Sequence, residues 1–229
     1  MTSPTSSARA ELTARVRANF DDLRRRVSAA GVDPDALTIV AVTKTHGPDA
    51  VRAAASVGLS HVGENYVDEL EVKRPLCEDL GLTWHYLGAL QSNKIARVAA
   101  VADCVDGLSR AKEITGFARL GSPASFKLQV DFTGRDGRGG CTPEEVPALA
   151  TATREAGLLL TGLMTVAPPD PRGAADAFAA LRRQCDALGL KECSMGMSDD
   201  LELALAAGTT ELRVGSALFG ARGAVSAHR

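Results

Sequence analysis

From residue 37 to the C-terminal region, the sequence alternates between two kinds of segment. Short apolar runs rich in β-branched residues, such as 37–43 and 126–132, are followed by alanine-rich stretches with a helical period. Strands that are apolar almost throughout are buried on both faces, as in a parallel sheet covered by helices. The alternation therefore predicts an α/β fold built from right-handed strand–helix units.

Eight such units fit into the sequence, the last of them completed by a short helix that opens near residues 215–217. The expected strands are 37–43, 61–63, 84–88, 104–106, 126–132, 159–164, 193–195 and 211–214. The expected helices lie near 49–57, 65–79, 92–101, 110–119, 144–156, 173–188 and 199–207. Glycines stand where five of these helices should end, as a C-terminal cap requires. Eight units predict a (β/α)8 TIM barrel, and a doubly wound open sheet is the alternative.

An additional amphipathic helix is predicted before the first strand, over residues 8–30. Apolar residues recur along it at spacings of three and four: Leu12, Val16, Phe20, Leu23 and Val27. Residues 1–7 are expected to be disordered. No repeat or low-complexity linker divides the remainder, so residues 8–229 are expected to form one domain.

Composition excludes several classes of function. The net charge is −2 and aromatic residues make up 4% of the chain, so neither nucleic acid nor a membrane is an expected partner. The five cysteines are odd in number and scattered, which argues against a disulfide framework and a structural zinc site. The first residues lack the order of a secretory signal, and a cytoplasmic location is expected.

Lys44 follows directly on the first expected strand. In a parallel barrel, the carboxyl ends of the strands form the rim at which active sites assemble. Partial desolvation there lowers the pKa of a lysine and leaves an amine that forms Schiff bases with aldehydes and ketones. The alternative is a lysine that extends from the strand end into water.

The last two strands are followed by small and hydroxyl-bearing residues. Gly215 and the backbone amides near Ser216 are positioned to open a short helix, and amides at a helix start bind phosphate. Ser194 and Ser198 from the preceding segment are candidate hydroxyl ligands of the same anion. The acidic pair 199–200 would repel phosphate, and it is assigned to the cap of the next helix.

Other polar residues near strand ends allow two interpretations each. An inward-pointing Arg213 would place a cation beside a ligand, and a cation facing a pyridine nitrogen disfavours its protonation. Otherwise Arg213 is a surface residue. Asn65 is a candidate donor to a ligand oxygen, whereas Glu64 is assigned to the start of the following helix. His85 is either a base or a satisfied core histidine, and the loop 133–140 is either a lid or a solvated turn.

Taken together, these segments resemble the pyridoxal phosphate homeostasis protein family, single-domain relatives of the alanine racemase barrel. The matching stretches are AVTKT at 41–45, GENY at 63–66, WHYLGALQSNK at 84–94, GLM at 162–164, SMGMSDD at 194–200 and RVGSALFGAR at 213–222. The resemblance implies a barrel of fold type III that binds pyridoxal 5′-phosphate (PLP).

The resemblance also implies roles for individual residues. Lys44 would carry the cofactor as a Schiff base, Arg213 would face the pyridine nitrogen, and Asn65 would lie near the ring. The phosphate cradle would be formed by Ser194, Ser198, Gly215 and Ser216. The family is associated with PLP homeostasis and not with an established reaction, so PLP and apo enzymes that use PLP are the expected partners.

The sequence departs from the family in places. Asp131 stands where relatives have asparagine, Arg138 lies near the position of a lysine, and the turn 45–48 differs from the usual form. After the last strand and the Gly-Ser pair at 215–216, only residues 217–229 remain, so a second domain with a base opposite the lysine is not expected. This favours a monomer without efficient racemisation. The alternatives are a PLP-dependent racemase or decarboxylase and a Schiff-base aldolase that uses no cofactor.

Overall fold

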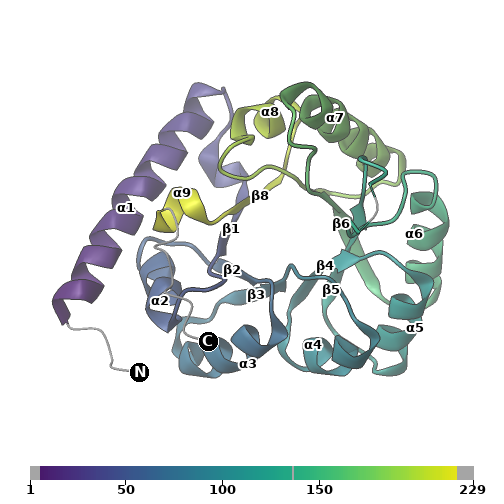
Figure 1. Ribbon diagram of the computed structural model, residues 1–229, viewed down its shortest axis with the longest axis horizontal. Helices are drawn as coiled ribbons and strands as arrows, with labels where there is room; N and C mark the ends of the chain where they lie inside the picture. The colour runs from purple at the N-terminus through teal and green to yellow at the C-terminus, as the bar shows by residue number, and fades with distance from the viewer. Residues whose placement is uncertain (1–5, 136, 221–229) are drawn as a thin grey trace.

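The computed structural model describes residues 6–135 and 137–220, and within them eight parallel strands close into a barrel in chain order (Figure 1). The strands are β1 (Thr38–Val42), β2 (His61–Glu64), β3 (Thr83–Tyr86), β4 (Cys104–Leu108), β5 (Ser125–Val130), β6 (Leu159–Thr165), β7 (Glu192–Ser194) and β8 (Glu211–Val214). β8 pairs with β1, from Thr38 opposite Glu211 to Ala41 opposite Val214. The predicted barrel is confirmed, and this pairing excludes the open sheet.

Helices surround the barrel and connect its strands (Figure 1). They are α1 (Ser6–Ala29), α2 (Pro48–Ser56), α3 (Val67–Leu76), α4 (Ile95–Val101), α5 (Ala111–Arg119), α6 (Val146–Glu155), α7 (Pro171–Ala187), α8 (Leu201–Ala206) and α9 (Ser216–Phe219), with 3-10 turns η1 (Pro34–Ala36), η2 (Glu78–Leu80) and η3 (Ser92–Lys94). Among the described helices, none is both long enough and apolar enough to span a bilayer.

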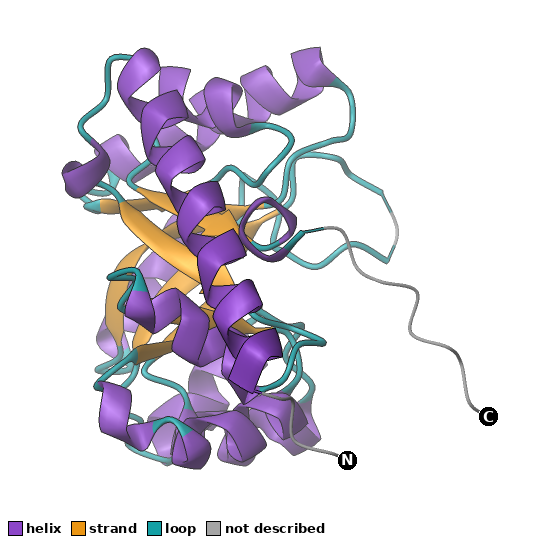
Figure 2. Cartoon of the chain, turned by 90° about the vertical axis from the view of Figure 1, so that its left-hand side faces the viewer, coloured by secondary structure: helices purple, strands orange, loops and turns teal. Residues whose placement is uncertain are grey.

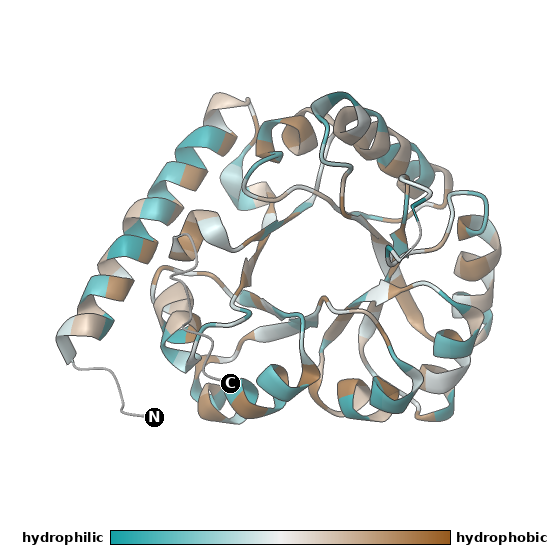
Figure 3. Ribbon diagram, in the orientation of Figure 1, coloured by the Kyte–Doolittle hydropathy of each residue, from teal (hydrophilic) through white to brown (hydrophobic). Residues whose placement is uncertain are grey.

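The core lies between the strands and the surrounding helices. Hydrophobic and hydrophilic residues alternate along these helices (Figure 3). β4 and β8 are buried along their whole length, as expected for strands covered on both faces. Phe117 of α5 packs edge-on against Phe126 of β5, with ring centroids 4.9 Å apart. The predicted helix-ending glycines adopt the left-handed conformation: Gly58, Gly81, Gly157, Gly189 and Gly208.

The predicted N-terminal helix is α1, which runs across the outside of the barrel (Figure 2). Its buried residues are Val16, Phe20, Leu23 and Val27, and it packs against α2, α8 and α9. The helix begins at Ser6, two residues before the predicted start. Residues 1–5, part of the segment expected to be disordered, lie outside the described residues.

Candidate functional site

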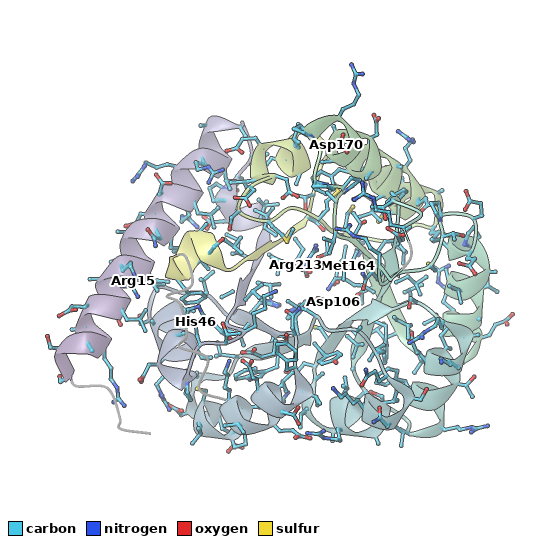
Figure 4. The ribbon with its side chains drawn as sticks, in the orientation of Figure 1. Arg15, His46, Asp106, Met164, Asp170 and Arg213 are labelled. Carbon is cyan, nitrogen blue, oxygen red and sulfur yellow. The ribbon has the colours of Figure 1, made fainter. Side chains whose placement is uncertain are left out.

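A cavity of about 460 Å³ lies at the carboxyl ends of the strands. This volume falls in the range of small-molecule sites. Apolar side chains form part of its wall: Val42, Leu87, Met164, Val166 and Met197. In Figure 4, Met164 and Arg213 lie toward the barrel centre, whereas His46 lies nearer α2 and α9. The rim predicted from the sequence is therefore the rim that contains the cavity.

Six of the seven predicted site residues line this one cavity. They are Lys44, Asn65, Ser198, Arg213, Gly215 and Ser216. They come from four places far apart in the sequence, namely the ends of β1 and β2, the loop after β7 and the end of β8. The fold thus brings an amine, a guanidinium, an amide and two hydroxyls to the same space.

Ser194 is the predicted residue that does not reach the cavity. It is fully buried at the end of β7, and its Oγ accepts a hydrogen bond of 2.6 Å from Arg213 Nη1. Arg213 Nη2 donates to the carbonyl oxygen of Thr165, also at 2.6 Å. The assignment of Ser194 to the phosphate cradle is therefore replaced, because this hydroxyl holds Arg213 in place.

Arg213 points inward and contributes to the cavity wall, with only 5% of the residue exposed. Burial lowers its pKa, and the carboxylates of Glu211 and Asp106 act in the opposite direction. An arginine stays protonated in proteins even when it is buried. The guanidinium is therefore a fixed cation in the cavity.

The hydroxyl of Ser198 lies beside the start of α9. Ser198 Oγ is 3.0 Å from Ser216 Oγ and accepts a hydrogen bond of 3.1 Å from the amide of Ala217. The two hydroxyls and this amide form a cluster of the kind that binds an anion. The predicted cap is confirmed for Asp200, which occupies the N-cap position of α8, whereas Asp199 lines the cavity.

Asn65 follows β2 and is half-buried at the cavity. The loop after β3 lies directly against it, and a Cβ atom at Gly88 would collide with the carbonyl oxygen of Asn65. Glycine at this position therefore allows the two loops to approach each other, and their contact fixes the backbone of Asn65.

Lys44 occupies a tight turn after β1. The carbonyl oxygen of Thr43 accepts a hydrogen bond of 3.0 Å from the amide of His46, and Thr45 has a φ of +67°. The left-handed conformation costs a residue with a Cβ atom about 1–2 kcal/mol. The turn reverses the chain at the rim, and Lys44 and His46 both line the cavity.

A buried ionic network lies behind this turn. Glu64 ends β2 with its carboxylate buried, and Glu64 Oε1 accepts hydrogen bonds from Lys73 Nζ at 2.7 Å and Thr43 Oγ1 at 2.5 Å. Glu64 Oε2 has no partner among the described residues. Burial raises the pKa of Glu64 to about 7, against the opposing effect of Lys73 and Thr43. The assignment of Glu64 to the helix start was wrong, because Lys73 of α3 draws its carboxylate inward.

A second set of charges fills the barrel interior. Asp106 Oδ2 lies 2.9 Å from His85 Nδ1, and Asp106 Oδ1 lies 3.0 Å from Lys127 Nζ. Lys127 also pairs with Glu192 and Glu211, at 3.1 and 3.0 Å. Burial alone would lower the pKa of His85, but Asp106 outweighs it and raises this pKa to about 10. His85 is thus a satisfied core residue, the second of its two interpretations.

His85, Asp106 and Glu211 have potential metal-ligating atoms within 4.8 Å of one another. The ammonium group of Lys127 is bonded to both carboxylates and already supplies a cation between them. These residues therefore form an ion-pair cluster stabilised by internal charge balance.

Neither charged network was expected from the sequence. A signal for the interior cluster was available, because Asp106, Lys127 and Glu211 interrupt strands that are otherwise apolar, and a charge in such a strand is buried only when it is paired. The network behind Lys44 gives a weaker signal. Glu69 and Lys73 have the i, i+4 spacing of an ordinary surface pair, although Lys73 is only 4% exposed.

The loop after β5 lies close to one wall of the cavity. Arg138 Nη1 donates to the carbonyl oxygens of Val166 and Ala167, at 3.2 and 3.3 Å. Val166 lines the cavity, so the loop is attached to the cavity wall through its basic side chain. Residue 136 of this loop lies outside the described residues.

Comparisons with known proteins point to one group. The model of a family described as alanine racemase, N-terminal domain, matches residues 13–223. The pyridoxal phosphate homeostasis protein of Pseudomonas aeruginosa is 42% identical over 209 residues, which cover 87% of this chain and 91% of that protein. The protein of the same name from Escherichia coli is 35% identical over 226 residues, covering 89% and 95%.

The structure is also similar to a solved one that contains a ligand. PipY of Synechococcus elongatus, solved with PLP bound, superimposes with a TM-score of 0.77 at 31% sequence identity. The match covers 90% of this chain and all of that one.

Proposed function

The chain belongs to the alanine racemase N-terminal domain family and, within it, to the pyridoxal phosphate homeostasis proteins, and we propose that it binds PLP as a Schiff base on Lys44 and acts in PLP homeostasis without a reaction of its own. The observation that carries this proposal is the single cavity shared by Lys44, Arg213 and the hydroxyls beside α9. The amine of Lys44, the guanidinium of Arg213 and the hydroxyls each correspond to a different part of the cofactor.

The residues present fit that cofactor. Bound PLP supplies an aldehyde that reacts with a primary amine and a ring that withdraws electrons. Lys44 would supply the amine. Ser198, Ser216 and the backbone amides at the start of α9 would hold the phosphate, and Gly215 leaves space for its approach. Asn65 would bind a ring substituent.

The environment of Arg213 supports a role without turnover. Ser194 and Thr165 hold the guanidinium, so it cannot easily turn away from a ligand. A fixed cation beside the pyridine nitrogen would disfavour protonation of that nitrogen, and an unprotonated ring withdraws electrons less strongly. Binding and release therefore suit this site better than chemistry on an amino acid.

We further propose that the protein is a monomer, lies in the cytoplasm and passes PLP to apo enzymes that use it. The five cysteines are all buried and unpaired within the described part of the chain, which suits a reducing compartment. Light scattering during gel filtration tests the monomeric state. Reactivation of an apo enzyme by the loaded protein, at a rate above that of free release, tests the transfer.

Borohydride trapping tests the central proposal. Purified protein is loaded with PLP, reduced with borohydride, digested and analysed by mass spectrometry. We expect a pyridoxyl phosphate adduct on Lys44, absent in Lys44→Ala and retained in a control, Lys112→Ala, which changes an exposed lysine of α5. Failure of the wild-type protein to take up PLP would overturn the proposal, and a sugar phosphate adduct from cell extract would favour the aldolase.

The enzymatic alternative is tested separately. The loaded protein is incubated with a panel of L-amino acids, followed by chiral analysis and measurement of released carbon dioxide. We expect neither inversion nor decarboxylation. Turnover of any of these amino acids that disappears in Lys44→Ala would show instead that the protein is an enzyme.

A further inference from the structure

The two peptide groups that flank Lys44 are both bound to one charged cluster of α3. The carbonyl group of Thr43 belongs to the peptide bond before Lys44, and it accepts a hydrogen bond of 2.8 Å from Lys73 Nζ. The amide of Thr45 belongs to the peptide bond after Lys44, and it donates to Glu69 Oε2 at 2.9 Å and Oε1 at 3.2 Å. Lys44 is therefore held on both sides.

Within this cluster, every N–H group of the Lys73 ammonium has an acceptor, one of which is the carbonyl oxygen of Thr43. Lys73 Nζ lies 2.6 Å from Glu69 Oε2 and 2.7 Å from Glu64 Oε1, so three acceptors surround its three N–H groups. Glu69 and Lys73 are one turn apart on α3, which packs against β2 and β3 on the outside of the barrel (Figure 1). Two side chains of one helix thus hold the peptide groups before and after Lys44.

The turn needs this support because of its third residue. Thr45 has a φ of +67°, a conformation that turns of this kind usually give to glycine. A β-branched residue adopts it only where the surroundings impose it. The bond from His46 N–H to the carbonyl oxygen of Thr43 closes the turn from within, and the bond from Thr45 N–H to Glu69 holds the strained residue from outside it.

We propose that Glu69 and Lys73 are positioning residues, which hold the strained turn so that the amine of Lys44 stays at the cavity for covalent capture of PLP. The inference rests on the proposed function. In the capture step the ε-amine of Lys44 adds to the aldehyde carbon, a C=N bond replaces the C=O bond, and the oxygen leaves as water with the two amine protons. Misplacement of a reacting amine slows such a step without removing the phosphate contacts.

The test compares two ligands. Stopped-flow absorbance measures the rate of capture of PLP, and calorimetry measures the affinity for 4′-deoxypyridoxine 5′-phosphate, which has no aldehyde. We expect Glu69→Ala to slow capture by about ten- to a hundredfold and to leave the affinity for the analogue unchanged. The matched control is Glu71→Ala, since Glu71 lies on the same helix and binds Arg97 of α4.

A double variant separates positioning from a general loss of structure. Glycine adopts positive φ without support, so Thr45→Gly in the Glu69→Ala background should restore most of the capture rate. Glu69→Gln keeps an acceptor for the amide of Thr45, and we expect a smaller effect from it. Unchanged capture in Glu69→Ala, or no rescue by glycine, would overturn the inference. If the wild-type protein binds neither ligand, the proposed function fails instead.

Discussion

Two serines of one segment have different roles because their hydroxyls lie at different depths. Ser194 ends β7 and is fully buried beneath the rim, where it binds the guanidinium of Arg213. Ser198 lies four residues later in the loop and reaches the hydroxyl of Ser216. The first serine therefore orients a cation, and the proposed contact with the phosphate is made by the second.

The two serines predict different ligand selectivity. Ser198→Ala removes a hydrogen bond to a charged group, so we expect about a tenfold loss of affinity for PLP and little change for pyridoxal, which lacks the phosphate. Ser194→Ala releases Arg213, so we expect both affinities to fall by a similar factor. Titrations of the two variants with both ligands check this. Equal losses for both ligands in Ser198→Ala would contradict the assignment.

The raised pKa of Glu64 predicts a dependence of stability on pH. Burial raises this pKa from 4.5 to about 7, so the folded protein binds the proton more tightly than the unfolded chain. This contribution is complete below pH 4.5 and is lost as the pH rises to about 7, by on the order of 3 kcal/mol. Urea unfolding from pH 4.5 to 8 should show the decline in the wild-type protein and a flatter profile in Glu64→Gln. Parallel profiles would contradict the prediction.

At the scale of single elements, β5 carries a charge that other strands of the barrel must balance. Lys127 is 1% exposed, and its ammonium lies between carboxylates from β4, β7 and β8. Burial would lower the pKa of Lys127, but the three carboxylates together raise it well above its usual value. The cluster therefore links four strands of the barrel through one side chain.

Removal of this ammonium group should lower the free energy of unfolding far more than removal of an exposed ammonium group. Lys127→Met leaves the buried Glu211 without its cation and leaves Asp106 with His85 as its remaining partner, and breaking a buried ion pair in this way costs about 3–5 kcal/mol. The control, Lys112→Met, changes an exposed residue of α5 and should alter stability by less than about 0.5 kcal/mol. Urea unfolding measures both. A small effect at Lys127 would mean that the carboxylates are protonated or hydrated in the variant.

The elements themselves were predictable from the sequence. All eight strands and the connecting helices lie where apolar runs and helical periods place them, because burial on both faces leaves a one-dimensional signal. The positions of the helix ends were predicted from glycines such as Gly58, which adopts the positive φ of a C-terminal cap. Six of the seven site residues also gather in one cavity, since the carboxyl ends of parallel strands meet at one rim.

The sequence did not predict which polar groups bind one another. Lys73 contacts Glu64 nine residues away and Thr43 thirty residues away, and neither spacing has a periodic signature. The depth of Ser194 was also hidden, because residue type does not reveal whether a side chain at a strand end reaches above the rim. These contacts depend on the register of neighbouring strands, which only the closed barrel defines.

At the scale of the whole molecule, α1 supports α9, the first and last helices of residues 6–220. α1 packs against α9, and Asn19 Nδ2 donates a hydrogen bond of 2.8 Å to the carbonyl oxygen of Leu218 (Figure 2). α9 begins at Ser216, one of the residues that line the cavity. The apolar stripe of α1 predicted an amphipathic helix, but not that this helix packs beside the site.

This arrangement predicts a remote effect on ligand affinity. Asn19→Ala removes the contact with α9, at a cost in stability of about 1 kcal/mol. Part of that cost should appear as looser positioning of Ser216, and we expect the affinity for PLP to fall by about two- to fivefold. PLP titration and urea unfolding measure the two effects on the same protein samples.

The matched control is Arg25→Ala, which changes the exposed face of α1, where Arg25 pairs with Asp22. It should alter neither affinity nor stability appreciably, because an exposed ion pair of this kind contributes little. If Asn19→Ala loses stability and keeps the wild-type affinity, α1 stabilises the barrel without influencing the cavity. A loss of affinity in Asn19→Ala that is absent in Arg25→Ala would instead link α1 to the proposed phosphate end of the site, because the hydrogen bond removed is with the element that carries Ser216.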